Sequence, residues 1–154
     1  MQQEFDDEIA YYEKAINIYS SLNNPHQAGN SYNNLGNVYQ AKQDFQNAAE
    51  CYQVAYEIYS NFQDWSNASQ TLGKWGRVLE AQENYAQALP IFIRGLAIGL
   101  QHYQDSIGYY INALARMLQQ VGERQFQVIW REATGEECAG EVREAIWAAR
   151  DELG

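Results

Sequence analysis

The stretch Leu35-Gly36-Asn37-Val38-Tyr39 recurs 40 residues later as Trp75-Gly76-Arg77-Val78-Leu79. With the same offset, Asp44-Phe45-Gln46-Asn47-Ala48 recurs as Asn84-Tyr85-Ala86-Gln87-Ala88. Within each copy the apolar residues are three and four positions apart, as on one face of an α-helix. A polar segment ending at Asp44 separates the two halves of the first copy, and Asp is a favoured N-cap residue. Each 40-residue unit is therefore predicted to be a pair of helices joined by a tight turn.

The order of large and small residues within the units resembles the tetratricopeptide repeat. Counted from Ser69, the second unit keeps the family pattern except that Gly95 replaces Ala. Counted from Gly29, the first unit matches at Tyr32, Leu35, Gly36, Tyr39, Ala48, Tyr52 and Ala55. The resemblance implies an all-α fold, a right-handed α-solenoid of stacked antiparallel helix pairs. The period exceeds the usual length of about 34 residues and is similar to that of kinesin light chains and bacterial sensor arrays. We expect the extra residues to lengthen the second helix of each unit.

A single solenoid over residues 1–154 is predicted, with N-caps at Asn24, Asp44, Asp64 and Asp105. Its parts are a half repeat at 5–21, repeats at 25–61 and 64–101, a degenerate repeat at 105–134 and a capping helix at 137–152. The half repeat leads us to expect a fragment of a longer array. A first helix that exposed the face of Phe5, Ile9, Tyr12 and Ile16 would promote self-association.

Charge and composition exclude several classes of ligand. The chain has 20 acidic and 10 basic residues and a net charge of −10, which opposes binding to nucleic acid or anionic membranes. The most apolar stretch, Tyr85 to Leu100, is interrupted by Gln87 and Arg94 and is too short for a membrane span. Two cysteines make no disulfide framework, so we expect a reducing, cytoplasmic location.

The sequence offers no arrangement of residues suited to catalysis. His26 and His102 are far apart in sequence and are expected as exposed or half-buried histidines that flank helices, because a metal site needs three or four converging ligands. Cys51 is expected as a buried, inert thiol, and Cys138 is expected to open the last helix. We expect no enzymatic activity, no metal and no cofactor.

The resemblance places the binding surface on the first helices, which line the concave face of the solenoid. Amides suit the backbone of a peptide and arginines suit carboxylates. An alternative interpretation pairs Arg77 and Arg116 with acids such as Glu80. The expected groove residues are Asn30, Asn33, Asn34, Asn37, Lys74, Arg77, Tyr109, Asn112 and Arg116.

The predicted function is binding of a protein or peptide that carries an acidic group. The alternative function is a regulatory or sensor domain of a bacterial signalling ATPase or protease-like protein, in contact with its own neighbouring domain.

Overall fold

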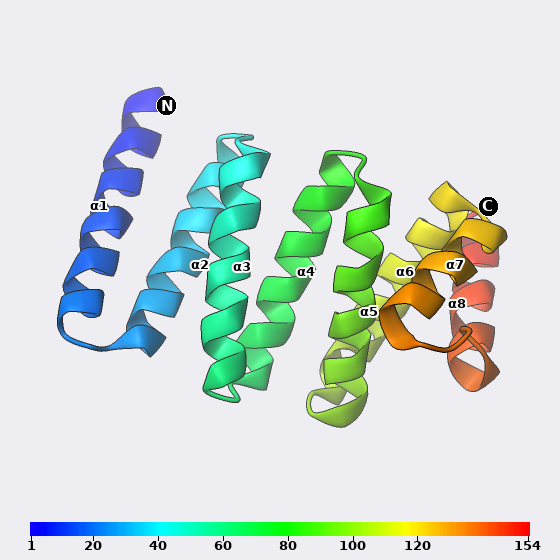
Figure 1. Ribbon diagram of the computed structural model, residues 1–154. Helices are drawn as coiled ribbons and strands as arrows, with labels where there is room; N and C mark the ends of the chain where they lie inside the picture. The colour runs from blue at the N-terminus through cyan, green and yellow to red at the C-terminus, as the bar shows by residue number, and fades with distance from the viewer. The chain divides into compact units, whose positions relative to one another are not determined.

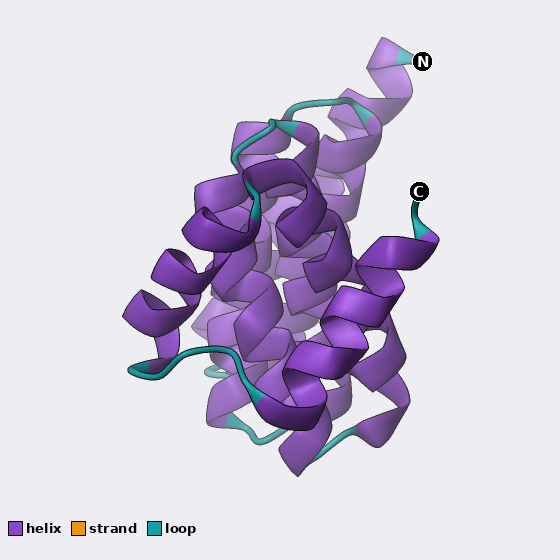
Figure 2. Cartoon of the chain, turned by 90° about the vertical axis from the view of Figure 1, so that its right-hand side faces the viewer, coloured by secondary structure: helices purple, strands orange, loops and turns teal.

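Every regular element of the computed structural model, which describes residues 1–154, is a helix (Figure 2). The all-α prediction is confirmed. None of the helices combines the length and apolar character needed to cross a membrane. The elements are α1 (Gln2–Ser21), α2 (Pro25–Ala41), α3 (Phe45–Asn61), α4 (Trp65–Ala81), α5 (Tyr85–Gln101), a short 3₁₀ turn η1 (Gln104–Ser106), α6 (Ile107–Val121), α7 (Glu123–Thr134) and α8 (Gly140–Glu152).

The helices fall into two compact units, residues 1–82 and 83–154. In each unit, helices that follow one another along the chain pack together, as in an α-solenoid. Figure 1 shows α1 to α4 following one another in the first unit. The boundary lies inside the repeat predicted over 64–101, so a single stack over the whole chain stays a prediction.

The 40-residue period arises from equal helices, not from longer second helices as predicted. Helices α2, α3, α4 and α5 each have 17 residues, and three-residue turns separate them. The turns place a residue with positive φ at the same position, namely Asn23, Gln43, Gln63 and Glu83. In the first three turns the N–H of the next residue bonds back to a carbonyl of the preceding helix, as from Asp44 to Tyr39 at 2.8 Å. This is the Schellman arrangement, which satisfies carbonyls at a helix end.

Three of the four predicted N-caps are confirmed. The side chain of Asn24 accepts from the N–H of Gln27, and Asp44 and Asp64 make the matching bonds in α3 and α4. The prediction for Asp105 is wrong, because Asp105 lies within η1 and α6 begins only at Ile107.

Close packing between α2 and α3 depends on two glycines of α2. A Cβ at Gly29 would lie 2.8 Å from Cγ2 of Ile58, and a Cβ at Gly36 would lie 2.6 Å from Cε1 of Tyr52. Tyr52 itself is fully buried, and it clusters with Ala48 and with Val78 of α4. The small and large positions of the repeat therefore interlock.

In the second unit α7 packs against α5 and α6, and α8 packs against α6. Ile146 of α8 is fully buried, while Leu153 is 47% exposed. The last helix begins at Gly140, so its predicted start at 137 is wrong. Thr134 and Gly135 end α7, with Gly135 in the left-handed conformation.

Candidate functional site

A row of asparagines on α2 is the first part of the predicted surface. Asn37 is exposed, and Asn30, Asn33 and Asn34 are half-buried. Residues three, four and seven apart lie on one side of a helix. The four side chains therefore form one polar strip along α2.

Tyrosines from α3 hold two of these amides in place. The hydroxyl of Tyr59 donates to Oδ1 of Asn30 at 2.6 Å. The hydroxyl of Tyr52 lies 2.8 Å from Oδ1 of Asn37 and 2.7 Å from Oε1 of Gln40, and these oxygens share its single hydrogen. Burial raises the pKa of Tyr59 to about 12, so this hydroxyl remains a donor at neutral pH. The amide oxygen of Asn37 is thus engaged from within, and its Nδ2 group can donate outward.

Lys74 joins α4 to this strip. Its Nζ lies 3.3 Å from Oδ1 of Asn33 and 6.0 Å from the ring centre of Tyr52. Thr71, one turn earlier and buried, also donates to Oδ1 of Asn33, at 3.5 Å. Burial lowers the pKa of the Lys74 ammonium from its ordinary value. Both contacts of the ammonium are with neutral groups, so they do not offset its charge.

Arg77 forms an ion pair with Glu80, as the alternative interpretation expects. Its Nε lies 3.4 Å from Oε1 of Glu80, one turn along α4, and its side chain is 54% exposed. An ion pair with an exposed arginine contributes about 0–1 kcal/mol. Arg77 is therefore a weaker candidate for binding than Lys74.

The predicted residues of α6 lie in the second unit. Tyr109 is 41% exposed and meets the ring of Tyr110 edge-on, with ring centres 5.1 Å apart. Asn112 is exposed and Arg116 is half-buried. Positions 109, 112 and 116 share one side of the helix. The structure thus gathers the predicted residues into two sets, one on α2 and α4 and one on α6, and their union in one groove stays a prediction.

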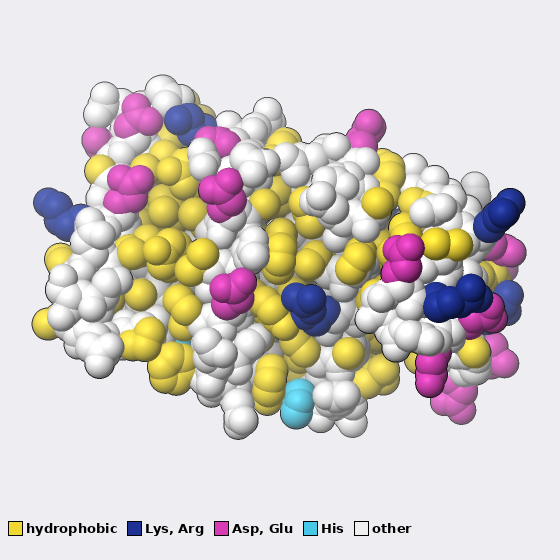
Figure 3. All heavy atoms as spheres, in the orientation of Figure 1, with side chains coloured by type: hydrophobic (Ala, Val, Ile, Leu, Met, Phe, Trp, Pro, Cys, Tyr) yellow, Lys and Arg dark blue, Asp and Glu magenta, His cyan; other side chains and the backbone are white.

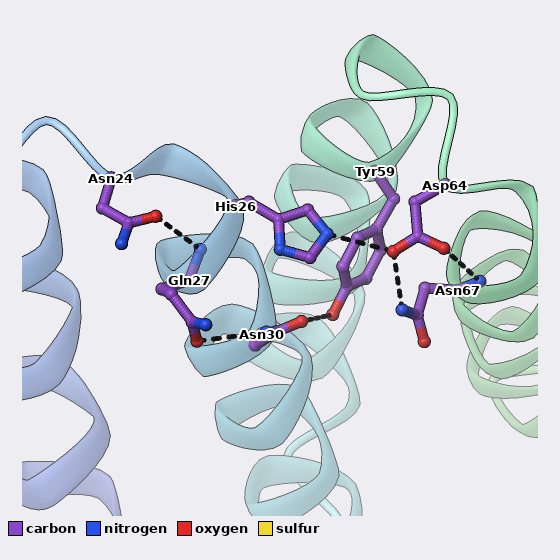
Figure 4. A network of polar contacts seen from close by, with 7 residues as sticks. All are labelled: Asn24, His26, Gln27, Asn30, Tyr59, Asp64 and Asn67. Atoms are coloured by element: carbon purple, nitrogen blue, oxygen red, sulfur yellow. Dashed lines mark hydrogen bonds and ion pairs between the residues drawn. The ribbon is translucent and has the colours of Figure 1, made fainter.

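His26 belongs to a polar network that the sequence did not reveal (Figure 4). Its Nε2 lies 3.0 Å from Oδ2 of Asp64, which also accepts from Nδ2 of Asn67 at 2.7 Å. The His26 ring stands edge-on to the rings of Tyr59 and Phe62. The start of α2 is thereby tied to the end of α3 and to the start of α4.

The acid at the centre of this network has an altered pKa. Burial raises the pKa of Asp64, but hydrogen bonds from the Asn67 side chain, from His26 and from the Asn67 backbone outweigh burial. The net result is a pKa below the ordinary value. His26 is half-buried, as predicted, with 36% of its side chain exposed. No group of three or more His, Cys, Asp or Glu side chains is placed to hold a metal ion.

The two cysteines are free and buried. The prediction that Cys138 opens the last helix is wrong, because α8 begins two residues later, at Gly140. The N–H of Cys138 donates to Oε1 of Gln127 at 2.9 Å, and its carbonyl accepts from Nε2 of Gln127 at 3.0 Å. Burial raises the pKa of Cys138 to about 11 and that of Cys51 to about 12. Neither thiol is suited to nucleophilic chemistry at neutral pH.

The face of α1 that was expected to be exposed is covered. Ile16 is 8% exposed and clusters with Leu35 of α2, and Ile9 and Tyr12 pack against the same cluster. That part of the self-association prediction is wrong. The exposed apolar side chains of α1 are on the other side of the helix, at Tyr11 and Ile18.

Comparison with known proteins identifies the family. A family model described as "Soluble NSF attachment protein, SNAP" matches residues 1–113. The match agrees with the tetratricopeptide-like helical repeats seen in the sequence and in the packing. A search of curated proteins finds no match. The family match covers α1 to α5 and the first half of α6, so the chain belongs to the soluble NSF attachment protein family.

Proposed function

We propose that the chain is a protein-interaction scaffold, and that the first-helix surfaces of α2 and α4 bind a peptide segment that carries an acidic group. The family match supports a protein ligand, since the family takes its name from attachment to a protein, NSF. The long repeats, which resemble those of kinesin light chains, support the same class of function.

The observation that carries the proposal is the environment of Lys74. The ammonium is partly withdrawn from water, and its contacts are an amide oxygen and an aromatic ring. A carboxylate brought to this ammonium forms a charge-assisted hydrogen bond in a partly desolvated place, where such bonds are stronger than at the surface. The chain has 20 acidic residues and a net charge of −10, yet these two contacts of the Lys74 ammonium are with neutral groups.

The neighbouring amides supply the other half of the recognition. Tyr52 and Tyr59 fix the orientation of Asn37 and Asn30 from behind, so these side chains lose little freedom when a ligand binds. Asn34 on the same strip supplies a further donor and acceptor. Amides suit a peptide backbone, which presents both N–H and C=O groups.

The location that fits this function is a reducing compartment such as the cytoplasm. Both cysteines are free, and buried thiols persist without oxidation where disulfides are kept reduced.

Selection from a random peptide library displayed on phage tests the proposal. The wild-type chain is expected to enrich peptides with Asp or Glu at a fixed position. Lys74→Met should abolish that enrichment. Lys14→Met, which removes an exposed lysine from α1, should preserve it. Enrichment without acids, or acids selected equally by Lys74→Met, would exclude Lys74 from the site.

A further inference from the structure

The outer side of α1 carries an apolar stripe. Tyr11 is 69% exposed, Ile18 51% and Leu22 68%, and Ala15 between them is half-buried. Spacings of four, three and four residues place these side chains on one side of the helix. Ile9, Tyr12 and Ile16, on a different side of α1, pack in a cluster with Leu35 of α2, and the stripe is not part of that cluster.

The repeat identifies what kind of element this stripe fits. A shift of 40 residues carries Tyr11, Ala15 and Ile18 onto Cys51, Ala55 and Ile58 of α3, and Leu22 onto Phe62, the residue that follows α3.

In α3 the side that carries Cys51 and Ile58 is the side that packs against α2. Cys51 clusters with Leu35 of α2, Gly29 of α2 lies against Ile58, and the ring of His26 lies 5.4 Å from that of Phe62. The stripe on α1 is therefore the equivalent of a surface that binds an antiparallel helix.

Charge distinguishes this surface from its counterpart on α3. Glu4, Asp7 and Glu8 precede Tyr11 on the same side of α1, whereas positions 47 and 48 of α3 are Asn and Ala. Figure 3 shows acidic side chains gathered over the N-terminal end of α1. Helix α1 contains five acids and one lysine, so a second copy of α1 would offer too few basic groups to pair with these acids. The charge favours a basic partner over a second copy.

We infer that the outer side of α1 binds an amphipathic helix of a partner protein, antiparallel to α1. This helix has a small residue against Ile18, where α2 presents Gly29 to Ile58, and basic residues against Asp7 and Glu8. The surface is distinct from the first-helix surfaces of the proposed function, so the two proposals succeed or fail separately.

A synthetic peptide with the sequence of residues 25–43 provides the probe, because α2 is the chain's own helix of this kind. In the structure Gly36 of α2 lies against Tyr52 of α3, so positions 40 and 43 lie near the start of α3. If the peptide binds α1 in the same way, these two positions lie near the acidic start of α1. One peptide carries Gln40→Lys and Gln43→Lys, and the matched control carries Gln40→Glu and Gln43→Glu. Fluorescence anisotropy with the full 154-residue chain measures both.

The lysine peptide is expected to bind at least tenfold more tightly than the glutamate peptide. Ile18→Asp with Leu22→Asp should weaken its binding at least tenfold, and Leu153→Asp, at an exposed leucine of the second unit, should not. The peptide could also bind by displacing the chain's own α2, but such displacement would not depend on Ile18 and Leu22. The double variant Ile18→Asp with Leu22→Asp therefore distinguishes binding to the outer side of α1 from displacement of α2.

Three results would overturn the inference. They are no binding of either peptide, equal binding of both, or binding that survives Ile18→Asp with Leu22→Asp. Light scattering that showed a dimer of the wild-type chain, abolished by the same two substitutions, would assign the surface to a second copy instead.

Discussion

A Cβ at Gly36 of α2 would lie 2.6 Å from Cε1 and 2.8 Å from Cδ1 of Tyr52 of α3. The Tyr52 ring is fully buried, and amides of α2 hold its hydroxyl, so the ring cannot easily retreat. The glycine thus sets how closely the two helices approach.

Gly36→Ala is expected to destabilise the fold. Overpacking costs about 1–3 kcal/mol, and it opposes the gain of about 1 kcal/mol in helix propensity. The same change at Gly108, where a Cβ meets nothing within 4 Å, should be neutral or stabilising. Urea unfolding followed by circular dichroism compares the two. Equal free energies of unfolding in both variants would contradict the close packing.

The Asp64 network predicts a pH dependence of stability. A pKa lowered in the folded state contributes stability that is present above the ordinary value of 3.8 and is lost as the pH falls through the folded pKa. Asp64→Asn keeps an N-cap residue and removes the charge. It should cost about 1 kcal/mol above pH 5, because hydrogen bonds to a charged group are lost at a partly exposed site.

The difference between wild type and Asp64→Asn should shrink as the pH falls below the ordinary value. Asp44→Asn is the matched control, because Asp44 makes the same bonds to Asn47 and has no bond to a histidine. Its effect should be the smaller of the two. A difference for Asp64→Asn that stays constant down to pH 2.5 would show that the charge of Asp64 does not contribute.

The buried thiols are expected to resist modification. With pKa values raised to about 12 and about 11, Cys51 and Cys138 are almost entirely protonated at pH 8. Reaction with Ellman's reagent should be slow in the folded chain and fast in denaturant. Gln127→Leu, which leaves the backbone N–H and C=O of Cys138 without their partner, should speed the reaction of Cys138 alone. A rapid reaction of wild-type Cys138 would contradict its buried position.

The helices and their caps were predictable because they depend on residues close together in the sequence. Asn24, Asp44 and Asp64 stand directly before the apolar pattern resumes, and each of them caps a helix. The turns were harder to predict, since Gln43, Gln63 and Glu83 adopt a left-handed conformation that usually indicates Gly or Asn.

The candidate site was predictable as a set of residues but not as a set of contacts. Which amide meets which tyrosine hydroxyl depends on the rotation of α3 against α2, and no local pattern encodes that rotation. The start of α8 was placed too early for a similar reason. The backbone of Cys138 bonds to Gln127 on α7 instead of joining the helix that follows.

Binding should depend unequally on the two cations of α4. For an acidic peptide selected on the wild-type chain, Lys74→Met is expected to raise the Kd more than tenfold, a change of about 1.4 kcal/mol. Arg77→Ala should raise it less than fivefold, because Arg77 is exposed and already paired with Glu80. Calorimetry measures both variants. The reverse order of effects would move the acidic group from Lys74 to Arg77.

Amide chemical-shift mapping with a selected acidic peptide tests the central claim most directly. The account predicts shifts on the first helices, at Asn34, Asn37 and Lys74, and little change at Gln53 and Glu57 on the exposed side of α3. Shifts confined to α3 with none at Asn34, Asn37 or Lys74 would contradict the account and place the binding surface on the second helices.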